Sequence, residues 1–332
     1  MGWVRDKFLL VVPAQWAIRV KDPQLAWLFC GVLGALILAS VIGEVLQKTA
    51  KSDGARSTIE NLNARIRAWW KMCAIFALTM MIGRIGSLVL FALLSLLALR
   101  EYITLMPTRR GDHRTLLWSF FIITPLQYYL IGIGWYGFFA IMIPAFAFLF
   151  IPTRIALTGD TEHFLERAAK IQFGIMVCLY SLSYAPALLV LRIPEFEGRN
   201  ARLLLYLVLI TQMSDVLKYT WGKLIGRHKI VPRVSPNKTW EGFVGGVLSA
   251  TALGAALWRV TPFTLWQAAG MSLVIALLGA AGGLVMSAIK RDAGVKDFGA
   301  TIEGHGGILD RIDSLCFAAP VFFHMVRYFF VR

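Results

Sequence analysis

Long apolar runs separated by short charged loops recur along the whole chain, and no other feature constrains its fold as strongly. A helix needs about 20 apolar residues to cross the hydrocarbon core of a bilayer. The run Met72–Leu99 fits either one long kinked span or two short spans split at Gly83-Arg84-Ile85-Gly86. We therefore predict an all-α, polytopic integral membrane protein with nine or ten transmembrane helices. The other spans are expected at Ala26–Leu46, Leu116–Ile133, Gly134–Ile151, Ile171–Leu191, Leu203–Tyr219, Trp240–Val260, Leu265–Ala288 and Ile312–Phe330.

The amino-acid composition excludes an ordinary soluble domain. Hydrophobic residues make up 58% of the chain and charged residues only 16%, and the mean hydropathy is +0.65. A soluble domain has about 45–50% apolar and about 25% charged residues. A net charge of +15 would suggest nucleic acid in a soluble protein, but these basic residues lie between apolar runs. Cytoplasmic loops beside anionic lipids explain them better, so we expect membrane lipids and no nucleic acid as partners.

Three charged loops indicate which membrane face carries the chemistry: Arg100–Arg114, Lys218–Thr239 and Arg291–Asp310. Two predicted spans separate the second loop from the third, so both emerge on one face. The connection between those spans, Arg259–Thr264, has one basic residue. The positive-inside rule then places both loops, and by counting back the first loop, in the cytoplasm. We expect a multi-pass protein of the inner (plasma) membrane with a cytoplasmic site, and the side of the N-terminus stays open.

The chain is expected to divide into three regions along the sequence. Residues 1–114 would hold N-terminal membrane helices and basic loops, and residues 115–202 would hold central membrane helices. Residues 203–332 would form a C-terminal catalytic membrane region. The charged N-terminal stretch is not followed by a cleavage site of small residues, so we expect no removable signal peptide.

The segment Ser287–Ser314 holds the densest cluster of charged residues and glycines. Its lysine and arginine side chains suit phosphate groups, and its aspartates supply the oxygen ligands that Mg²⁺ prefers. Asp310 and Asp313 are three residues apart, so they share one face of a helix. A solvated loop is the alternative, but it does not explain why two carboxylates lead into an apolar helix at Ile312. Cations for phosphate together with carboxylates for magnesium indicate phosphoryl or nucleotidyl transfer.

The spacing of these residues resembles the signature of the phosphatidate cytidylyltransferases, also called CDP-diacylglycerol synthases. The matching positions are Ser287, Lys290-Arg291, Lys296-Asp297, His305-Gly306-Gly307, Asp310-Arg311 and Asp313. A second block, Ser235–Phe243, resembles the family's S-P-x-K-T-W-E-G-F segment, and Arg100-Glu101-Tyr102 is a weaker match. The resemblance implies that CTP and phosphatidate react to CDP-diacylglycerol and pyrophosphate, with Mg²⁺ as the cofactor. The expected partners are therefore CTP, phosphatidate or a related lipid phosphate and, in a homodimer, a second copy of the chain.

The resemblance also implies a role for each matching residue. The expected metal ligands are Asp297, Asp310 and Asp313. The expected catalytic residues, which would hold phosphates, are Lys290, Arg291, Lys296, His305 and Arg311. The expected substrate-binding residues are Asp215, Ser235, Lys238, Glu241, Ser287, Gly306 and Gly307.

Three of these assignments have a second interpretation. Asp215 fits an ordinary membrane-interface residue equally well. Ser235 precedes Pro236, a pattern that is typical of a helix N-cap with proline in the first turn. His305 could simply pack in its loop. If it is functional, phosphate contact is favoured over general-base catalysis, because a phosphate monoester is already ionised near pH 7.

Three positions depart from the family pattern and indicate a divergent branch. Gly283 stands where the family has an acidic residue of the metal site, and Met286 stands where it has glutamate. Lys218 replaces an alanine in the family's Asp-x-x-Ala-Tyr segment. Losing a carboxylate weakens a magnesium site, since magnesium is usually held by only one or two. A paralogue that activates another lipid phosphate with CTP, a catalytically impaired homologue and a transporter are the alternative functions.

Overall fold

The computed structural model describes residues 22–49, 53–302 and 306–331. In this part of the chain the regular structure is helical apart from one two-stranded hairpin. Seven of its helical segments are long and apolar enough to cross a membrane. They confirm the all-α polytopic class, whereas the count of nine or ten spans stays a prediction. These segments are Pro23–Thr49, Arg84–Thr104, Asp112–Gly132, Tyr136–Ala156, Phe164–Val190, Ala201–Leu224 and Leu265–Asp292.

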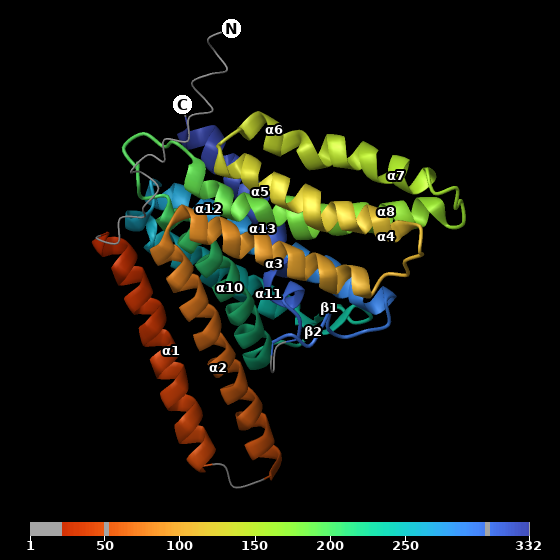
Figure 1. The fold of residues 1–332 in the computed structure, drawn as a ribbon. Helices are drawn as coiled ribbons and strands as arrows, with labels where there is room; N and C mark the ends of the chain where they lie inside the picture. The colour runs from red at the N-terminus through yellow and green to blue at the C-terminus, as the bar shows by residue number, and fades with distance from the viewer. Residues whose placement is uncertain (1–21, 50–52, 303–305, 332) are drawn as a thin grey trace.

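The first helices form a projecting hairpin followed by a sharp corner. α1 (Pro23–Thr49) packs along α2 (Asp53–Ile82), and both extend below the body of the molecule (Figure 1). Gly83 has a φ of 96°, a backbone conformation that favours glycine, and it separates α2 from α3 (Arg84–Thr104). The ambiguous run Met72–Leu99 is therefore two helices that meet at Gly83.

Three kinked helices with internal π turns form the central bundle. A π turn inserts one extra residue, and in the first of these helices Thr124 Oγ1 donates across the turn to the Ser119 carbonyl at 2.9 Å. The same helix ends at Gly132, whose carbonyl oxygen accepts a hydrogen bond from Arg84 at the corner before α3. The segments of the bundle are α4 (Asp112–Trp118), η3 (Ser119–Ile123), α5 (Thr124–Gly132), α6 (Tyr136–Ile141), η4 (Met142–Ala147), α7 (Phe148–Ala156), α8 (Phe164–Ile175), η5 (Met176–Ser181), α9 (Leu182–Ala187) and η6 (Leu188–Val190).

The C-terminal region adds four long helices and the hairpin. Small residues let two of these helices cross closely, because a Cβ on Gly242 or Gly246 would run into the backbone around Lys218 and Gly222. The strands pair antiparallel, with Lys229 opposite Thr239, and follow one another in a segment that was predicted only as a charged loop. The elements are α10 (Ala201–Leu224), β1 (Lys229–Val231), β2 (Ser235–Thr239), α11 (Trp240–Ala256), η7 (Trp258–Val260), α12 (Leu265–Asp292) and α13 (Leu309–Phe330).

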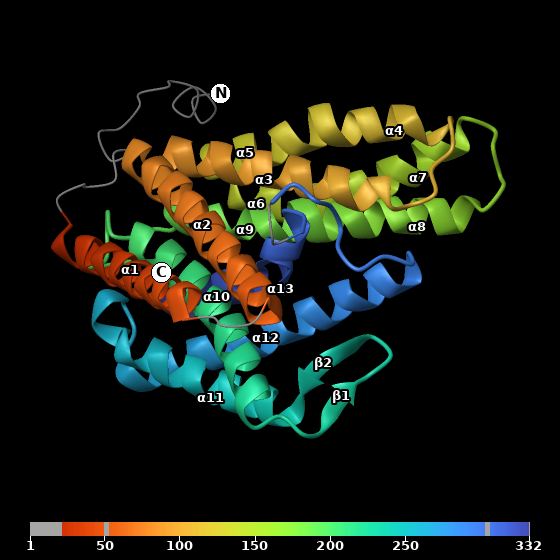
Figure 2. The same cartoon turned by 90° about the horizontal axis from the view of Figure 1, so that it is seen from below.

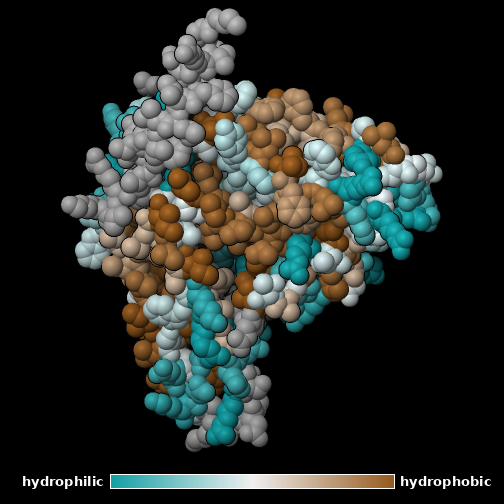
Figure 3. All heavy atoms as spheres, viewed as in Figure 1, coloured by the Kyte–Doolittle hydropathy of each residue, from teal (hydrophilic) through white to brown (hydrophobic). Residues whose placement is uncertain are grey.

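α13 runs through the centre of the hydrophobic core, where Cys316, Phe322 and Phe323 are fully buried. It packs against α3, α9, α10 and α12, so its first turn is held among helices from both halves of the chain. The hairpin lies beside the C-terminal half of α12 (Figure 2). The space-filling view shows a broad hydrophobic surface over the body and hydrophilic side chains toward the projecting ends of α1 and α2 (Figure 3).

A buried ion pair shows where the start of α1 lies relative to the β1–β2 hairpin. Asp22, just before α1, pairs with the Arg202 guanidinium in the first turn of α10, with Nε and Oδ2 2.5 Å apart. The hairpin follows the other end of α10. The start of α1 therefore lies at the end of the bundle opposite the hairpin.

Candidate active site

The last turn of α12 and the first turn of α13 are joined by a buried ion pair. Lys290 Nζ lies 2.7 Å from Asp310 Oδ1, and the two side chains are 12% and 3% exposed. The second oxygen, Asp310 Oδ2, accepts hydrogen bonds from the backbone N–H of Phe298 at 2.8 Å and of Gly307 at 2.9 Å. Both oxygens of Asp310 are thus engaged, and they tie the connecting loop to the two helices.

One turn further along α13, Asp313 meets Lys238 across a gap left by Gly283. A Cβ on Gly283 would lie 3.3 Å from Lys238 Nζ and 3.7 Å from Asp313 Oδ2. Lys238 reaches this point from β2. Burial lowers the pKa of its ammonium group, the charge of Asp313 opposes that shift, and the charge of Lys218 adds to it. An ammonium group and a carboxylate therefore converge at the position where the resemblance implies an acidic side chain.

α10 contributes a second pair of charges to the same place. Lys218 Nζ lies 2.8 Å from Asp215 Oδ1, and both residues interact electrostatically with Lys238. We call Asp215, Lys218, Lys238, Lys290 and Asp313 the charge cluster. Its members come from α10, β2, α12 and α13, and it brings together most of the predicted lysines and aspartates. Lys218, which was noted only as a departure from the family, proves to be part of it.

The carboxylates in and around the charge cluster differ in their capacity to hold a metal ion. Among the described residues, no three His, Cys, Asp or Glu side chains form a group that could bind one. The predicted trio of ligands is thus not assembled: Asp310 is fully engaged, and Asp297 is exposed on the loop. In the described part of the chain, no hydrogen bond reaches Oδ2 of Asp313 or of Asp215. Asp215 and Asp313 interact electrostatically, and their carboxylate oxygens are of the type that Mg²⁺ takes together with water and substrate phosphates.

Other predicted residues lie around the charge cluster with their own backbone partners. Arg291 is exposed and donates to the carbonyl oxygens of Val295 at 2.9 Å and Val234 at 3.3 Å, which links α12 to the hairpin. Ser287 Oγ donates to the Gly283 carbonyl at 2.6 Å. Lys296 is exposed on the loop, and Gly306, with a φ of 80°, turns the backbone near Asp297 and Asp310. The prediction for His305 lies outside the described residues.

Arg311, at the start of α13, is partly buried. Its carbonyl oxygen accepts from Gln212 Nε2 of α10 at 3.0 Å, whereas its buried Nε has no hydrogen-bond partner in the described part of the chain. A buried guanidinium nitrogen without an acceptor is costly and suits a ligand anion.

The helix cap expected at Ser235 is wrong. Ser235 opens β2, paired with Val231, and the N-cap of α11 is Thr239, whose hydroxyl accepts from the Gly242 N–H at 3.2 Å. Both residue types are good N-caps, but the hairpin extends the chain through Pro236 and delays the helix by one strand.

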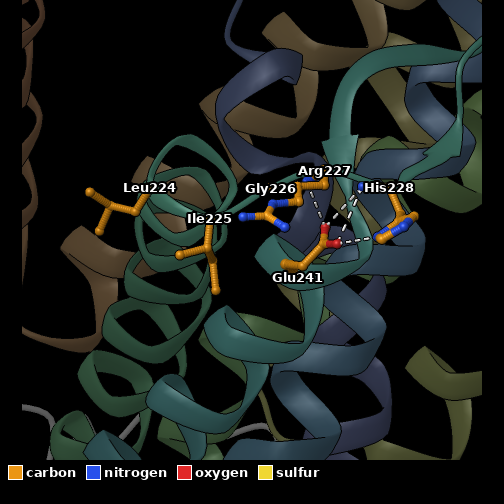
Figure 4. Close-up of a pocket in the computed structure, with 6 residues that line it drawn as sticks. All are labelled: Leu224, Ile225, Gly226, Arg227, His228 and Glu241. Carbon is orange, nitrogen blue, oxygen red and sulfur yellow. Dashed lines mark hydrogen bonds and ion pairs between the residues drawn. The ribbon is translucent and has the colours of Figure 1, made fainter.

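Glu241 binds the backbone of the segment between α10 and β1, just before the hairpin. Its carboxylate accepts from the backbone N–H of Arg227 at 3.0 Å and of His228 at 3.2 Å, and it lies 2.5 Å from His228 Nδ1 (Figure 4). These residues line a surface cavity of about 430 Å³ together with Leu224 and Ile225. The structure thus gives Glu241 backbone partners and leaves its predicted contact with substrate as a prediction.

The sequence assigned no role to Glu101, in the last turn of α3, although it reaches the active-site loop. It is 8% exposed and accepts hydrogen bonds from Thr301, Ile308 and Leu309. The available signal was a carboxylate at the end of an apolar run, which is expensive in a membrane protein unless it has a partner.

The fold is that of a polytopic helical membrane protein, and a cluster of ammonium and carboxylate groups lies at one end of its bundle. The family model described as the cytidylyltransferase family matches residues 63–329, and the chain belongs to that family.

Individual relatives agree with this family. The chain is 40% identical over 309 residues to the uncharacterized protein YnbB of Escherichia coli K12, covering 92% of this chain and 98% of that protein. It is 38% identical over 158 residues to a phosphatidate cytidylyltransferase of Staphylococcus aureus, covering 46% of this chain. A phosphatidate cytidylyltransferase of Staphylococcus saprophyticus is 36% identical over 158 residues. In both staphylococcal comparisons the match spans 60% of the relative's length.

Proposed function

We propose that this protein transfers the cytidylyl group of CTP to phosphatidate, yielding CDP-diacylglycerol and pyrophosphate. The observation that carries the proposal is the charge cluster, in which three ammonium groups and two carboxylates from four elements interact electrostatically, with Lys238 and Asp313 beside Gly283. Membership of the cytidylyltransferase family and the names of the staphylococcal relatives support the same reaction.

The reaction joins two anions, so the protein must first offset their repulsion. An oxygen of the lipid phosphate attacks the α-phosphorus of CTP, a new P–O bond forms, and the bond to the departing pyrophosphate breaks. Lys218, Lys238 and Lys290 supply positive charge around Asp313, and the buried Nε of Arg311 offers a further donor at the start of α13. Asp215 and Asp313 would hold Mg²⁺, which neutralises charge on the phosphates when it is bound.

The proposed site lies near the hairpin and the α12–α13 loop, two segments rich in basic residues. We infer from the positive-inside rule that these segments face the cytoplasm of a plasma-membrane protein, where CTP is available. The lipid acceptor would approach within the membrane. The division of the chain into three regions and the formation of a homodimer are likewise proposals.

A second candidate function is the activation of a different lipid phosphate with CTP. Gly283 and Met286 remove two negative charges that the family pattern carries and Lys218 adds a positive one, so these positions are about three charges more positive than the pattern they resemble. A more positive pocket favours an acceptor with more negative charge than phosphatidate.

The purified full-length chain in detergent, given CTP and Mg²⁺, tests both candidates. With phosphatidate it should release pyrophosphate and form an equal amount of CDP-diacylglycerol, and without lipid it should release neither. A panel of lipid phosphates, including a polyprenyl phosphate, identifies the preferred acceptor. No pyrophosphate with any member of the panel would contradict nucleotidyl transfer and favour an impaired homologue or a transporter.

A further inference from the structure

The carboxylate of Glu101 lies inside the loop that leads into α13. Its Oε1 accepts from Thr301 Oγ1 at 2.6 Å and from the Ile308 N–H at 3.0 Å, and its Oε2 accepts from the Leu309 N–H at 2.9 Å. Glu101 belongs to α3, some 200 residues earlier in the chain. One side chain of the N-terminal half therefore binds the loop on both sides of residues 303–305.

These hydrogen bonds complete the N-terminus of α13. The first backbone N–H groups of any helix have no partner within the helix, and they carry partial positive charge. The N-cap residue of α13, Ile308, has no side chain that can accept a hydrogen bond. Glu101 supplies that acceptor from another helix, so α13 begins at a position that α3 determines.

The loop is shaped to fit this carboxylate. A Cβ on Gly299 would lie 3.0 Å from Glu101 Oε1, and a side chain on Gly307 would collide with Oε2. A bridge between Ile302 and Gly306, with the N–H of Ile302 2.8 Å from the Gly306 carbonyl, closes the loop around it. A larger residue at 307 would displace Glu101 and also crowd the backbone nitrogen of Gly299, whereas one at 299 would require Glu101 to shift by a few tenths of an ångström.

The residue that follows Leu309 is Asp310, which pairs with Lys290, and Asp313 is one turn further. We propose that Glu101 is a positioning residue, whose carboxylate sets the start of α13 and thereby the placement of Asp310 and Asp313 in the site. It has no direct contact with the charge cluster among the described residues. The inference rests on the proposed function for its catalytic consequence, but its structural part stands independently.

The variant Glu101→Gln keeps the size of the side chain and replaces one acceptor oxygen with an NH₂ group. That group would face a backbone N–H, so one hydrogen bond is lost and the start of α13 shifts. A displacement of about 1 Å can cost on the order of 100-fold in rate. We expect kcat to fall by that order and the Mg²⁺ requirement to rise. The KM for CTP should change little, because Lys238 and Lys290 lie on β2 and α12.

Thr301→Val, which removes one of the three hydrogen bonds, should lower kcat in the same direction but less than Glu101→Gln. Glu101→Asp, which keeps the charge on a shorter side chain, should recover part of the activity. Glu166→Gln, at an exposed glutamate on α8, is the matched control and should behave as the unaltered protein. Unchanged kcat in Glu101→Gln, or an equal loss in Glu166→Gln, would overturn the proposal.

Hydrogen exchange gives a readout that does not depend on turnover. In Glu101→Gln the amides of Gly307, Ile308 and Leu309 should exchange faster, while α10 and α11 keep their protection. If the unaltered protein had no transferase activity, this result would still support the positioning role and only the proposed function would fail. Unaltered exchange at these amides, or equally faster exchange throughout the bundle, would refute a specific role.

Discussion

Two buried ion pairs, one in the central bundle and one in the C-terminal region, show how a structural pair differs from a functional one. Arg167 of α8 holds Asp112 of α4 with Nη2–Oδ1 and Nε–Oδ2 distances of 2.9 and 3.1 Å. Asp112 also accepts from the Arg109 N–H, and Arg167 also pairs with Asp160 at 3.1 Å. The network joins the two loops at that end of the bundle, and its carboxylate is completely buried.

The Lys290–Asp310 pair has a different neighbourhood. It is held by a single ammonium contact, and one turn along α13 the Oδ2 of Asp313 has no hydrogen-bond donor among the described residues. A closed network of planar, bidentate contacts stabilises a fold. Carboxylate oxygens that have no hydrogen-bond donor can instead bind a ligand. The comparison therefore assigns the first pair to stability and the second to the candidate active site.

Asp310→Asn should have the largest effect, because it acts on both turnover and folding. Breaking a buried pair leaves Lys290 without its counter-charge, which costs about 3 kcal/mol of unfolding free energy. Turnover should be lost along with the placement of the loop. Thermal unfolding and pyrophosphate release measure the two effects. In a Lys290→Met background the same change should cost much less stability, and an equal cost there would contradict the pairing.

Asp313→Asn should abolish turnover with little change in stability. Within the described ranges it accepts one hydrogen bond, the 2.6 Å contact with the neighbouring Ser314 N–H, which asparagine can keep. Removing a single electrostatic group from an active site costs about 100- to 1000-fold in kcat. Asp292→Asn, at the exposed end of α12, is the control for a lost surface charge. Normal turnover in Asp313→Asn would refute its assignment to the metal.

Gly283→Asp should change the metal dependence more than the maximal rate. The new carboxylate would lie beside Lys238 and Asp313, and the flexible end of Lys238 can move aside. An added charge contact of about 1 kcal/mol corresponds to roughly fivefold in affinity. The Mg²⁺ concentration for half-maximal turnover should fall by about that factor. Gly283→Asn, equal in size but uncharged, should not lower it; the same fall in both variants would exclude a charge effect.

Arg167→Met should have the smallest effect on turnover and a large one on stability. It leaves Asp112 buried without a counter-charge, so unfolding free energy should fall by about 3–5 kcal/mol. The kcat of the folded fraction should equal that of the unaltered protein. Arg109→Met, at a partly exposed arginine, should cost much less stability, because solvent screens its ion pairs. A selective loss of kcat in Arg167→Met would break the distinction between the two pairs.

The residues of the candidate site could be predicted because their spacing is local. Lys290, Asp310 and Asp313 all occur within one segment of the sequence, and their positions at helix ends follow from where the apolar runs begin and stop. The break at Gly83 was foreseen as one of two alternatives. The cap at Ser235 was wrong because a serine and a threonine four residues apart both suit an N-cap, and only the pairing of β2 with β1 decides between them.

The composition of this chain and the lengths of its apolar runs by themselves determined that it is a helical membrane protein. A short motif predicted the chemistry that its last third can support. Tertiary structure alone decided that Asp310 is committed to Lys290, that Lys238 faces Gly283, and that Glu101 completes α13. The reason is physical: hydropathy and helix periodicity act between near neighbours along the chain. A hydrogen bond between Glu101 and Leu309 exists only once packing has brought α3 and α13 together.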